Sequence, residues 1–284
     1  MDLDHVNLVK KLREYTGISI MECKKFLIES KWDFKKAINN IYKYSENKVI
    51  NKSIKKTKEG VIVISRSEDC KSAVILEVNS ETDFVIRNAY FMHFVMKVAD
   101  TALFIPKVFS VMDLNSENLL GESITVEQGK KNLILKLGEN IELNRLNKIV
   151  CKSSDHRIGY YLHGFRIGVL VHLNGGDDLI AKNIAMHIAA CNPMVISKDQ
   201  FSVKMISKKR KLFLEQSKKH DKNKSDDIYN KIVSGKLNKF IRDNSLLEQV
   251  YIKDNNLKVN DYLRENHVTV LSFIRFEVGN YGFM

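Results

Sequence analysis

The sequence predicts an α+β protein that combines an N-terminal helical module, two hairpin-plus-helix units and an inserted pair of helices. Apolar residues recur every three to four positions over residues 4–44, which is helical spacing. Paired β-branched runs appear near residue 61 and again near residue 159, and an apolar helical pattern follows each pair. A strongly charged stretch separates two further helical patterns inside the second unit.

Residues 1–50 are predicted to form a module of three short helices, followed by a polar, basic linker at 51–60. Ser19 with Glu22 three positions later is the capping-box arrangement that starts a second helix. Asp33 is the expected N-cap of the third helix. The apolar faces expected for the first two helices are Val6, Val9 and Leu12, and then Met21, Phe26, Leu27 and Ile28.

Residues 61–150 are predicted to form the first core subdomain. Two β-branched runs at 61–65 and 72–78 flank a polar turn, which indicates a hairpin. A short loop at 79–87 then leads to an apolar helix that begins near Asn88.

Residues 151–284 are predicted to form the second core subdomain, with the same order of elements. Strands at 159–163 and 166–173 form its hairpin, the next apolar helix follows a Gly-Gly-Asp-Asp loop, and a strand at 268–278 completes the sheet. We interpret the repeated order as a diverged internal duplication.

An insert at about 198–240 interrupts the second subdomain. Its apolar spacing, broken by the polar stretch EQSKKHDKNKSDD, predicts an antiparallel coiled-coil hairpin that serves as an arm. The residues that carry this spacing are Val203, Ile206, Arg210 and Phe213, and then Ile228, Ile232 and Phe240.

Composition narrows the class of protein but does not identify it. The formal net charge of +12 is compatible with an RNA or phosphate partner, yet the lysines are spread along the whole chain, as on solvated helix faces. No apolar run is long enough to predict a membrane span or a secretory signal, and the four cysteines lack metal-ligand spacing. We therefore expect a cytoplasmic protein with free thiols and no membrane contact.

No motif of an enzyme is present. The sequence lacks the phosphate-binding GxxxxGK(S/T), HExxH and GxSxG patterns. The adjacent Asp177 and Asp178 after two glycines are typical of a turn and helix cap, and His172 and His187 lie in apolar contexts typical of structural histidines. We predict no catalytic residue, no metal site and no cofactor.

Two turns contain conspicuous aromatic residues. Asn79 to Val85 connects a buried strand with a buried helix and carries Asp83 and Phe84. An aromatic residue on such a loop is either a binding anchor for another protein or a side chain that packs into its own core. The sequence by itself leaves both open. The second turn, His163 to Arg166, joins the repeated strands.

Seven stretches of the chain resemble the elongation factor Ts family in sequence and in order. They are LREYTGISIMECKK from Leu12, EVNSETDFV at 77–85, KLGENIELNR at 136–145, HGFRIGVLV at 163–171, IAMHIAA at 184–190, SGKLNKF at 234–240 and FIRFEVG at 273–279. The combination of TGxxxMxCKK with a later ETDFV is specific to that family, although either alone is a weak signal. The resemblance covers almost the whole chain.

The resemblance implies a guanine nucleotide exchange factor that binds elongation factor Tu in its GDP form. In that family the N-terminal module resembles a ubiquitin-associated fold, and the loop matching Thr82, Asp83, Phe84 and Val85 disturbs the partner's magnesium site. Supporting contacts fall on family positions that match Lys24, Leu137, Gly138 and His163.

Two points remain open at the level of the sequence. The alternative function is a basic RNA- or ribosome-binding protein, for which exposed aromatics interleaved with Lys and Arg are expected. The sequence also ends soon after FIRFEVG, where many family members continue into a helical module, so we expect that partner contact to be missing. An indirect tRNA or ribosome contact of the arm and the oligomeric state are not determined by the sequence.

Overall fold

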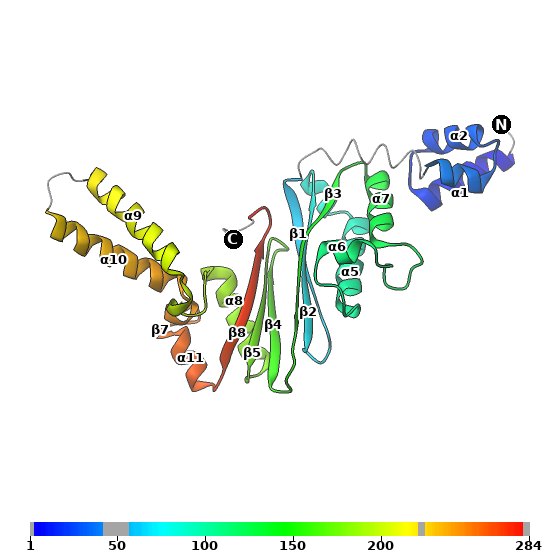
Figure 1. The fold of residues 1–284 in the computed structure, drawn as a ribbon. Helices are drawn as coiled ribbons and strands as arrows, with labels where there is room; N and C mark the ends of the chain where they lie inside the picture. The colour runs from blue at the N-terminus through cyan, green and yellow to red at the C-terminus, as the bar shows by residue number, and fades with distance from the viewer. Residues whose placement is uncertain (1–2, 42–56, 221–224, 281–284) are drawn as a thin grey trace. The chain divides into compact units, whose positions relative to one another are not determined.

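The computed structural model describes residues 3–41, 57–220 and 225–280 (Figure 1). It divides into two compact units, the first made of Met1–Val150, Leu162–Gly168 and Phe276–Met284 and the second of Cys151–Tyr161 and Val169–Arg275. Helices and antiparallel sheets occur together, which confirms the α+β class. Most of the predicted linker at 51–60, and the end of the N-terminal module, lie outside the described residues.

The N-terminal module contains α1 (Leu3–Thr16), α2 (Ile20–Glu29) and a further helical segment at 34–41. Ser19 starts α2 as predicted, since its side-chain oxygen accepts a hydrogen bond from the Glu22 backbone N–H at 3.3 Å. Asp33 likewise accepts from the Lys36 N–H at 3.0 Å. The side chains that form the core of this module are Val9, Leu12, Ile18, Cys23, Phe26, Leu27, Ala37 and Ile41.

The apolar face predicted for α2 was wrong at two positions. Met21 and Ile28 are exposed, whereas Cys23, Phe26 and Leu27 are buried. The buried residues are three and four positions apart and therefore lie on one face of the helix. A helix of this length in a small module buries only one such stripe, which leaves the other apolar residues in solvent.

The first sheet consists of β1 (Glu59–Arg66), β2 (Ser72–Ser80) and β3 (Ile141–Val150), in that order. Both pairings are antiparallel, and the register places Val61 opposite Val78. Helix α5 (Ala89–Phe104) packs on β1 and β2, and the shorter helices α6 (Val111–Asn115) and α7 (Val126–Leu137) complete the layer on that face (Figure 1). The apolar core lies between helices and sheet.

The second sheet has the strand order β4 (His156–His163), β5 (Ile167–Asn174) and β8 (Thr269–Glu277). Helix α8 (Asp178–Cys191) follows β5, as α5 follows β2 in the first unit. Asp177 is the N-cap of α8, because its carboxylate accepts from the Ile180 N–H at 2.8 Å. The predicted cap role of this aspartate is therefore confirmed.

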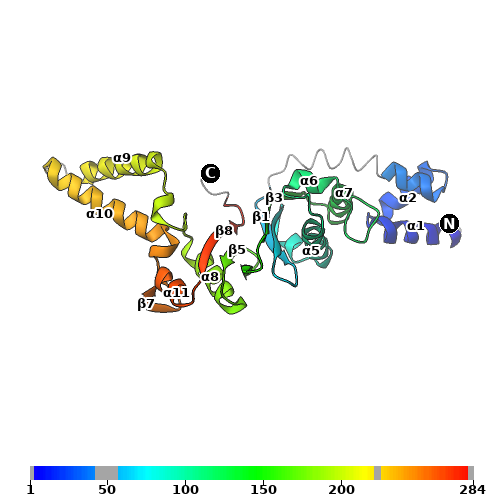
Figure 2. The same ribbon diagram turned by 60° about the horizontal axis from the view of Figure 1, so that its bottom comes forward.

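Two long helices, α9 (Val203–His220) and α10 (Asp226–Asn244), form the insert in the second unit (Figure 2). They pack against each other, with the rings of Phe213 and Phe240 6.4 Å apart. The predicted contact positions Val203 and Ile228 are exposed instead, and Tyr229 and Val233 are the buried residues of α10. The apolar stripe of α10 is therefore shifted by one residue from the predicted one.

The insert leaves and rejoins the second unit at neighbouring residues. Val195 and Ser245 form a parallel bridge, and the Leu246 N–H donates to the Val195 carbonyl oxygen at 2.9 Å. The 3₁₀ turn η1 (Lys198–Gln200) precedes α9. After the insert come the 3₁₀ turn η2 (Leu246–Glu248), strands β6 (Val250–Tyr251) and β7 (Asp254–Lys258), and helix α11 (Val259–Glu265). No helix in the described part of the chain is long and apolar enough to cross a membrane.

Candidate protein-binding site

The loop predicted from the sequence forms α4 (Asp83–Ile86), a single helical turn directly after β2. Within this turn Val85 is buried in the core of the first unit, whereas Phe84 is 79% exposed. Adjacent residues of a helical turn point in different directions, so burying Val85 directs Phe84 to solvent. The alternative that Phe84 packs into its own core is therefore wrong.

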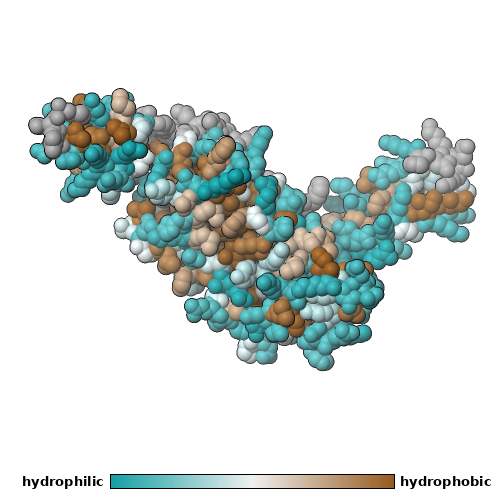
Figure 3. Space-filling model, turned by 180° about the vertical axis from the view of Figure 1, so that it is seen from behind, coloured by the Kyte–Doolittle hydropathy of each residue, from teal (hydrophilic) through white to brown (hydrophobic). Residues whose placement is uncertain are grey.

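Exposure alone does not distinguish Phe84 from other apolar side chains. Met112 and Val203 are at least as exposed, and Figure 3 shows apolar patches at several separate places on the face it presents. Single exposed hydrophobic residues are common on soluble proteins. Phe84 lies on a turn whose first residue, Thr82, is hydrogen-bonded to a distant part of the first unit.

Thr82 fixes the beginning of the turn through Glu139. The Thr82 backbone N–H donates to Glu139 Oε2 at 3.0 Å, and the Thr82 hydroxyl lies 2.8 Å from Oε1. A second hydrogen bond joins the same two segments with donor and acceptor exchanged, since the Asn140 N–H donates to Glu81 Oε1 at 2.7 Å. Hydrogen bonds to ionised groups are among the stronger ones, so the loop is held in one conformation.

Gly138 explains why Glu139 can reach the loop. It ends α7 with φ of +80°, a left-handed conformation that glycine adopts without steric cost, and its N–H donates to the Ile134 carbonyl oxygen at 2.8 Å. The chain reverses there and brings Glu139 and Asn140 to Thr82 and Glu81. The structure thus places Leu137 and Gly138, two predicted supporting residues, next to the loop.

Asp83 pairs with Arg87 one turn further along the chain, with 3.1 Å between Oδ2 and the guanidinium Nη2. The Arg87 side chain is largely in solvent and that of Asp83 is about half exposed, so the pair contributes little to stability. Its effect is to neutralise the carboxylate beside Phe84.

The turn between β4 and β5 belongs to the same unit as the loop. His163 is exposed on it, and the Phe165 carbonyl oxygen accepts from the Ile62 N–H of β1 at 2.7 Å. Arg166 forms an ion pair with Glu59 at 2.9 Å. These contacts bring the turn beside β1 and α4.

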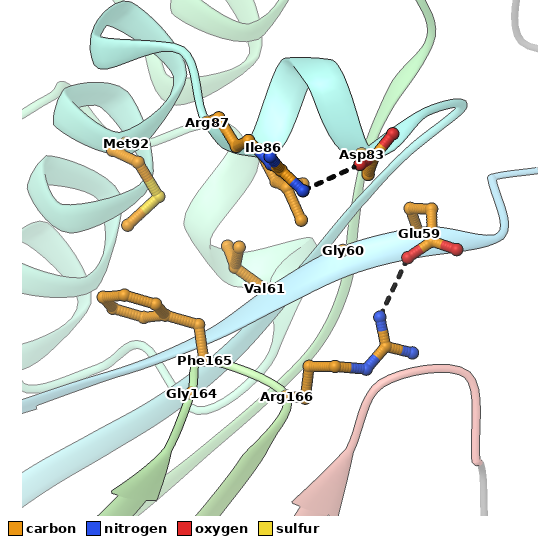
Figure 4. Close-up of a pocket in the computed structure, with 10 residues that line it drawn as sticks. All are labelled: Glu59, Gly60, Val61, Asp83, Ile86, Arg87, Met92, Gly164, Phe165 and Arg166. Carbon is orange, nitrogen blue, oxygen red and sulfur yellow. Dashed lines mark hydrogen bonds and ion pairs between the residues drawn. The ribbon is translucent and has the colours of Figure 1, made fainter.

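A cavity of about 610 Å³ lies between the turn and the loop (Figure 4). Phe165 and Met92 stand on one side of it and the Arg166–Glu59 pair on the other, with the Asp83–Arg87 pair at its rim. Volumes of about 300–1,000 Å³ are usual for binding pockets. The arrangement suits recognition of another molecule by shape and apolar contact.

One predicted site residue, Lys24, lies away from this cavity, and three residues of the site were not predicted. Lys24 is half-buried on α2, in the helical module. Glu81, Arg87 and Glu139 take part in the site but were not singled out from the sequence. The sequence carries one signal for Glu139, which is its position directly after Gly138, the glycine that ends α7.

An exposed aromatic residue on a loop held by hydrogen bonds, beside a cavity with both apolar and charged walls, suits a protein that binds another macromolecule. The family model of elongation factor TS matches residues 81–280 of the chain. The chain belongs to the elongation factor Ts family.

Individual relatives agree along nearly the full length. Elongation factor Ts of Legionella pneumophila strain Philadelphia 1 is 47% identical over 273 residues, which cover 96% of this chain and 91% of the relative. The proteins of the same name from Hahella chejuensis and from Coxiella burnetii strain RSA 493 are 41% and 39% identical over 274 residues, again 96% of this chain and 91% and 90% of theirs.

Family membership confirms the predicted role as a guanine nucleotide exchange factor for elongation factor Tu. It does not favour the alternative of a basic RNA- or ribosome-binding protein. The assignment of Thr82, Asp83, Phe84 and Val85 to a particular step remains a prediction, as do the supporting roles of Lys24, Leu137, Gly138 and His163.

Proposed function

We propose that the chain binds elongation factor Tu in its GDP form and uses Phe84 to disturb the site that holds Mg²⁺ and the phosphates. One observation carries this proposal: Phe84 is 79% exposed on a turn that Thr82 and Val85 fix on either side. A side chain already held in its binding position loses little conformational entropy on association. The turn therefore presents a preformed wedge.

The physical basis is a shift between two states of the partner. A GTPase holds GDP through Mg²⁺ and through backbone N–H groups that surround the phosphates. A wedge that fits only the state in which these contacts are broken stabilises that state by its differential affinity. The nucleotide is released intact, and no covalent step is proposed for this chain.

Magnitudes indicate that Phe84 acts together with a wider surface. A thousandfold loss of GDP affinity corresponds to about 4 kcal/mol of coupling. Burying one aromatic side chain contributes about 1.5–3 kcal/mol. The remainder is assigned to supporting contacts at Lys24, Leu137, Gly138 and His163, to the N-terminal module and to the helical arm.

The architecture supports this division of work. Each sheet has a hairpin, β1–β2 or β4–β5, followed by a helix and completed by a later strand. We take the two as copies of one ancestral unit, with the ubiquitin-associated-like module in front and the coiled-coil arm inserted in the second copy. The arm's contact with tRNA or the ribosome, if made, runs through the partner.

The test is release of a fluorescent GDP analogue from elongation factor Tu in a stopped-flow instrument, measured against the concentration of this chain. We expect Phe84→Ala to lower the maximal release rate by about 10- to 100-fold, from the 1.5–3 kcal/mol above. The concentration for half-maximal effect should change much less. Phe104→Ala is the matched control, because Phe104 is 67% exposed in the same unit but lies outside the cavity. An unaltered maximal rate for Phe84→Ala contradicts the proposal.

A further inference from the structure

Phe165 adopts a backbone conformation that its side chain disfavours. Its φ is +59° and that of Gly164 is +54°, the pattern of a two-residue hairpin turn of type I′. Glycine and asparagine fit both central positions of such a turn, whereas a bulky residue there is a conformational outlier. Residues in such strained conformations cluster at binding and active sites.

The side chain of Phe165 is not explained by packing within its own unit. It remains 47% exposed, and it forms one wall of the cavity together with Val61, Ile86 and Met92 (Figure 4). Its backbone supplies the structural link to β1, through the hydrogen bond from the Ile62 N–H. The phenyl ring is therefore dispensable for that link.

The charges around the cavity are paired. Asp83 lies 3.1 Å from Arg87 and Glu59 lies 2.9 Å from Arg166, so each carboxylate at the rim has its own guanidinium. A phosphate or other anion would have to compete with these carboxylates for both arginines. Apolar walls with a neutralised rim instead suit an uncharged, apolar side chain.

We propose that this cavity receives an apolar side chain of elongation factor Tu, with Phe165 as a second aromatic anchor beside Phe84. The inference rests on the proposed function, because Asp83 belongs to the loop that carries Phe84 and also lines the cavity. A partner surface engaged by that loop therefore passes over the cavity.

The two aromatics are expected to differ in what they control. Phe84 is assigned to the state in which GDP is lost, so it affects the maximal release rate. Phe165 lies on a turn fixed to β1 and contacts the partner whether or not the nucleotide has left, so it affects affinity in both states. An interaction of equal strength in both states changes the half-saturating concentration and leaves the maximal rate unchanged.

The experiment compares Phe165→Asn, Phe165→Gly and Phe165→Leu in the GDP-release assay with the full chain. Asparagine and glycine keep the turn and remove the apolar wall, and leucine restores part of it. We expect the half-saturating concentration to rise about tenfold for Asn and Gly, as for an interface anchor, and less for Leu. The maximal release rate should stay within about twofold of that of the parent chain. The melting temperature of the Gly variant should be no more than about 3 °C below that of the parent chain.

Four results distinguish a failure of this inference from a failure of the proposed function. An unchanged half-saturating concentration for both Asn and Gly overturns the inference, and so does a large fall in melting temperature for Gly, which would assign Phe165 to internal packing. If Phe84→Ala slows release while the Phe165 variants behave normally, only the present inference fails. If Phe84→Ala has no effect but the Phe165 variants bind weakly, the cavity stands as a binding surface and the wedge does not.

Discussion

Thr82 and Glu139 are bound to each other across 57 residues of sequence, by a backbone N–H to carboxylate hydrogen bond of 3.0 Å and hydroxyl contacts of 2.8 and 3.0 Å. Thr82 begins the turn that carries Phe84, and Glu139 follows the glycine that ends α7. The position of the exposed aromatic is thus determined by a residue from a distant part of the first unit. This pairing gives the loop its fixed geometry.

Glu139→Ala should slow nucleotide exchange because it loosens the turn that carries Phe84. Removing the carboxylate leaves the half-buried Thr82 N–H without its acceptor, which costs about 1–3 kcal/mol and lets the turn adopt other conformations. We expect a maximal GDP-release rate several-fold lower and a reduced melting temperature. Stopped-flow release and differential scanning calorimetry measure the two effects.

Glu142→Ala is the control for the loss of one negative charge. Glu142 is exposed on β3, where its carboxylate accepts from the Thr57 hydroxyl at 3.1 Å. Equal exchange rates for the two variants would show that charge, and not the bond to Thr82, is what matters.

His187 makes the second unit sensitive to acid. It is fully buried, with Nε2 3.0 Å from Gln249 Oε1, and its Nδ1 accepts from the Ile252 backbone N–H at 3.2 Å. The ring is therefore neutral, with its proton on Nε2. Burial lowers the pKa of His187, and the hydrogen bond to Gln249 opposes this only in part.

The lowered pKa of His187 makes the second unit less stable as the pH falls. Because the pKa in the folded chain lies below the unfolded value of about 6.5, the unfolded chain binds the proton first as pH falls. The contribution of His187 to the free energy of unfolding is therefore fully present above about pH 6.5. It is lost as the pH falls below that value, with a slope of at most about 1.4 kcal/mol per pH unit. Urea denaturation between about pH 5 and 8 measures this slope.

His187→Gln isolates the contribution, because glutamine does not titrate. Its free energy of unfolding should depend less steeply on pH below about 6.5 than that of the parent chain. His172→Gln serves as a comparison, since burial and the nearby His156 also lower the pKa of His172. Identical slopes for the parent chain and His187→Gln would contradict a buried neutral His187.

Two glycines in the second unit should respond to alanine with opposite signs. A Cβ at Gly159 of β4 would lie 2.6 Å from the Ala181 backbone and side chain of α8, so the strand and helix would have to separate. We expect Gly159→Ala to cost about 1–3 kcal/mol. Gly235 lies inside α10, and a Cβ added there would meet no neighbouring atom within 4 Å, so Gly235→Ala should stabilise by about 0.5–1 kcal/mol.

Thermal or urea denaturation of both glycine variants gives the comparison. Circular dichroism checks that each variant keeps its helix content. A Gly159→Ala variant as stable as the parent chain would mean that β4 and α8 do not approach as closely as the structure has them.

The hairpins and main helices could be predicted because their local patterns agree with their final environment. The runs at 61–65 and 72–78 are β-branched, and both strands are buried on both faces. Strand β3 was not predicted, since IELNRLNKIV carries several polar and charged residues. Two of these are satisfied by distant groups, Arg145 by Glu77 at 2.7 Å and Lys148 by carbonyl oxygens at the end of α5. Such partners are invisible in a local pattern.

The site shows a similar limit. The residue types of the loop pointed to Asp83 and Phe84, but whether the ring faces the core or solvent depends on Val85, which competes for the same core. The hydrogen bonds that Thr82 donates to Glu139 and Asn140 donates to Glu81 join segments almost sixty residues apart, and no spacing rule relates these segments. In the insert, the buried stripe of α10 was predicted one residue too early, at Ile228, whereas the structure buries Tyr229.

The bridge between Val195 and Ser245 has a consequence for how the arm can change over time. Because the chain leaves and re-enters the unit through neighbouring residues, the length of the two helices can change without displacing the rest of the unit. A lineage can lengthen, trim or replace them by editing one continuous stretch of gene, while the host sheet keeps its strand order. The same junction offers protein engineers a ready place to graft a foreign helical hairpin.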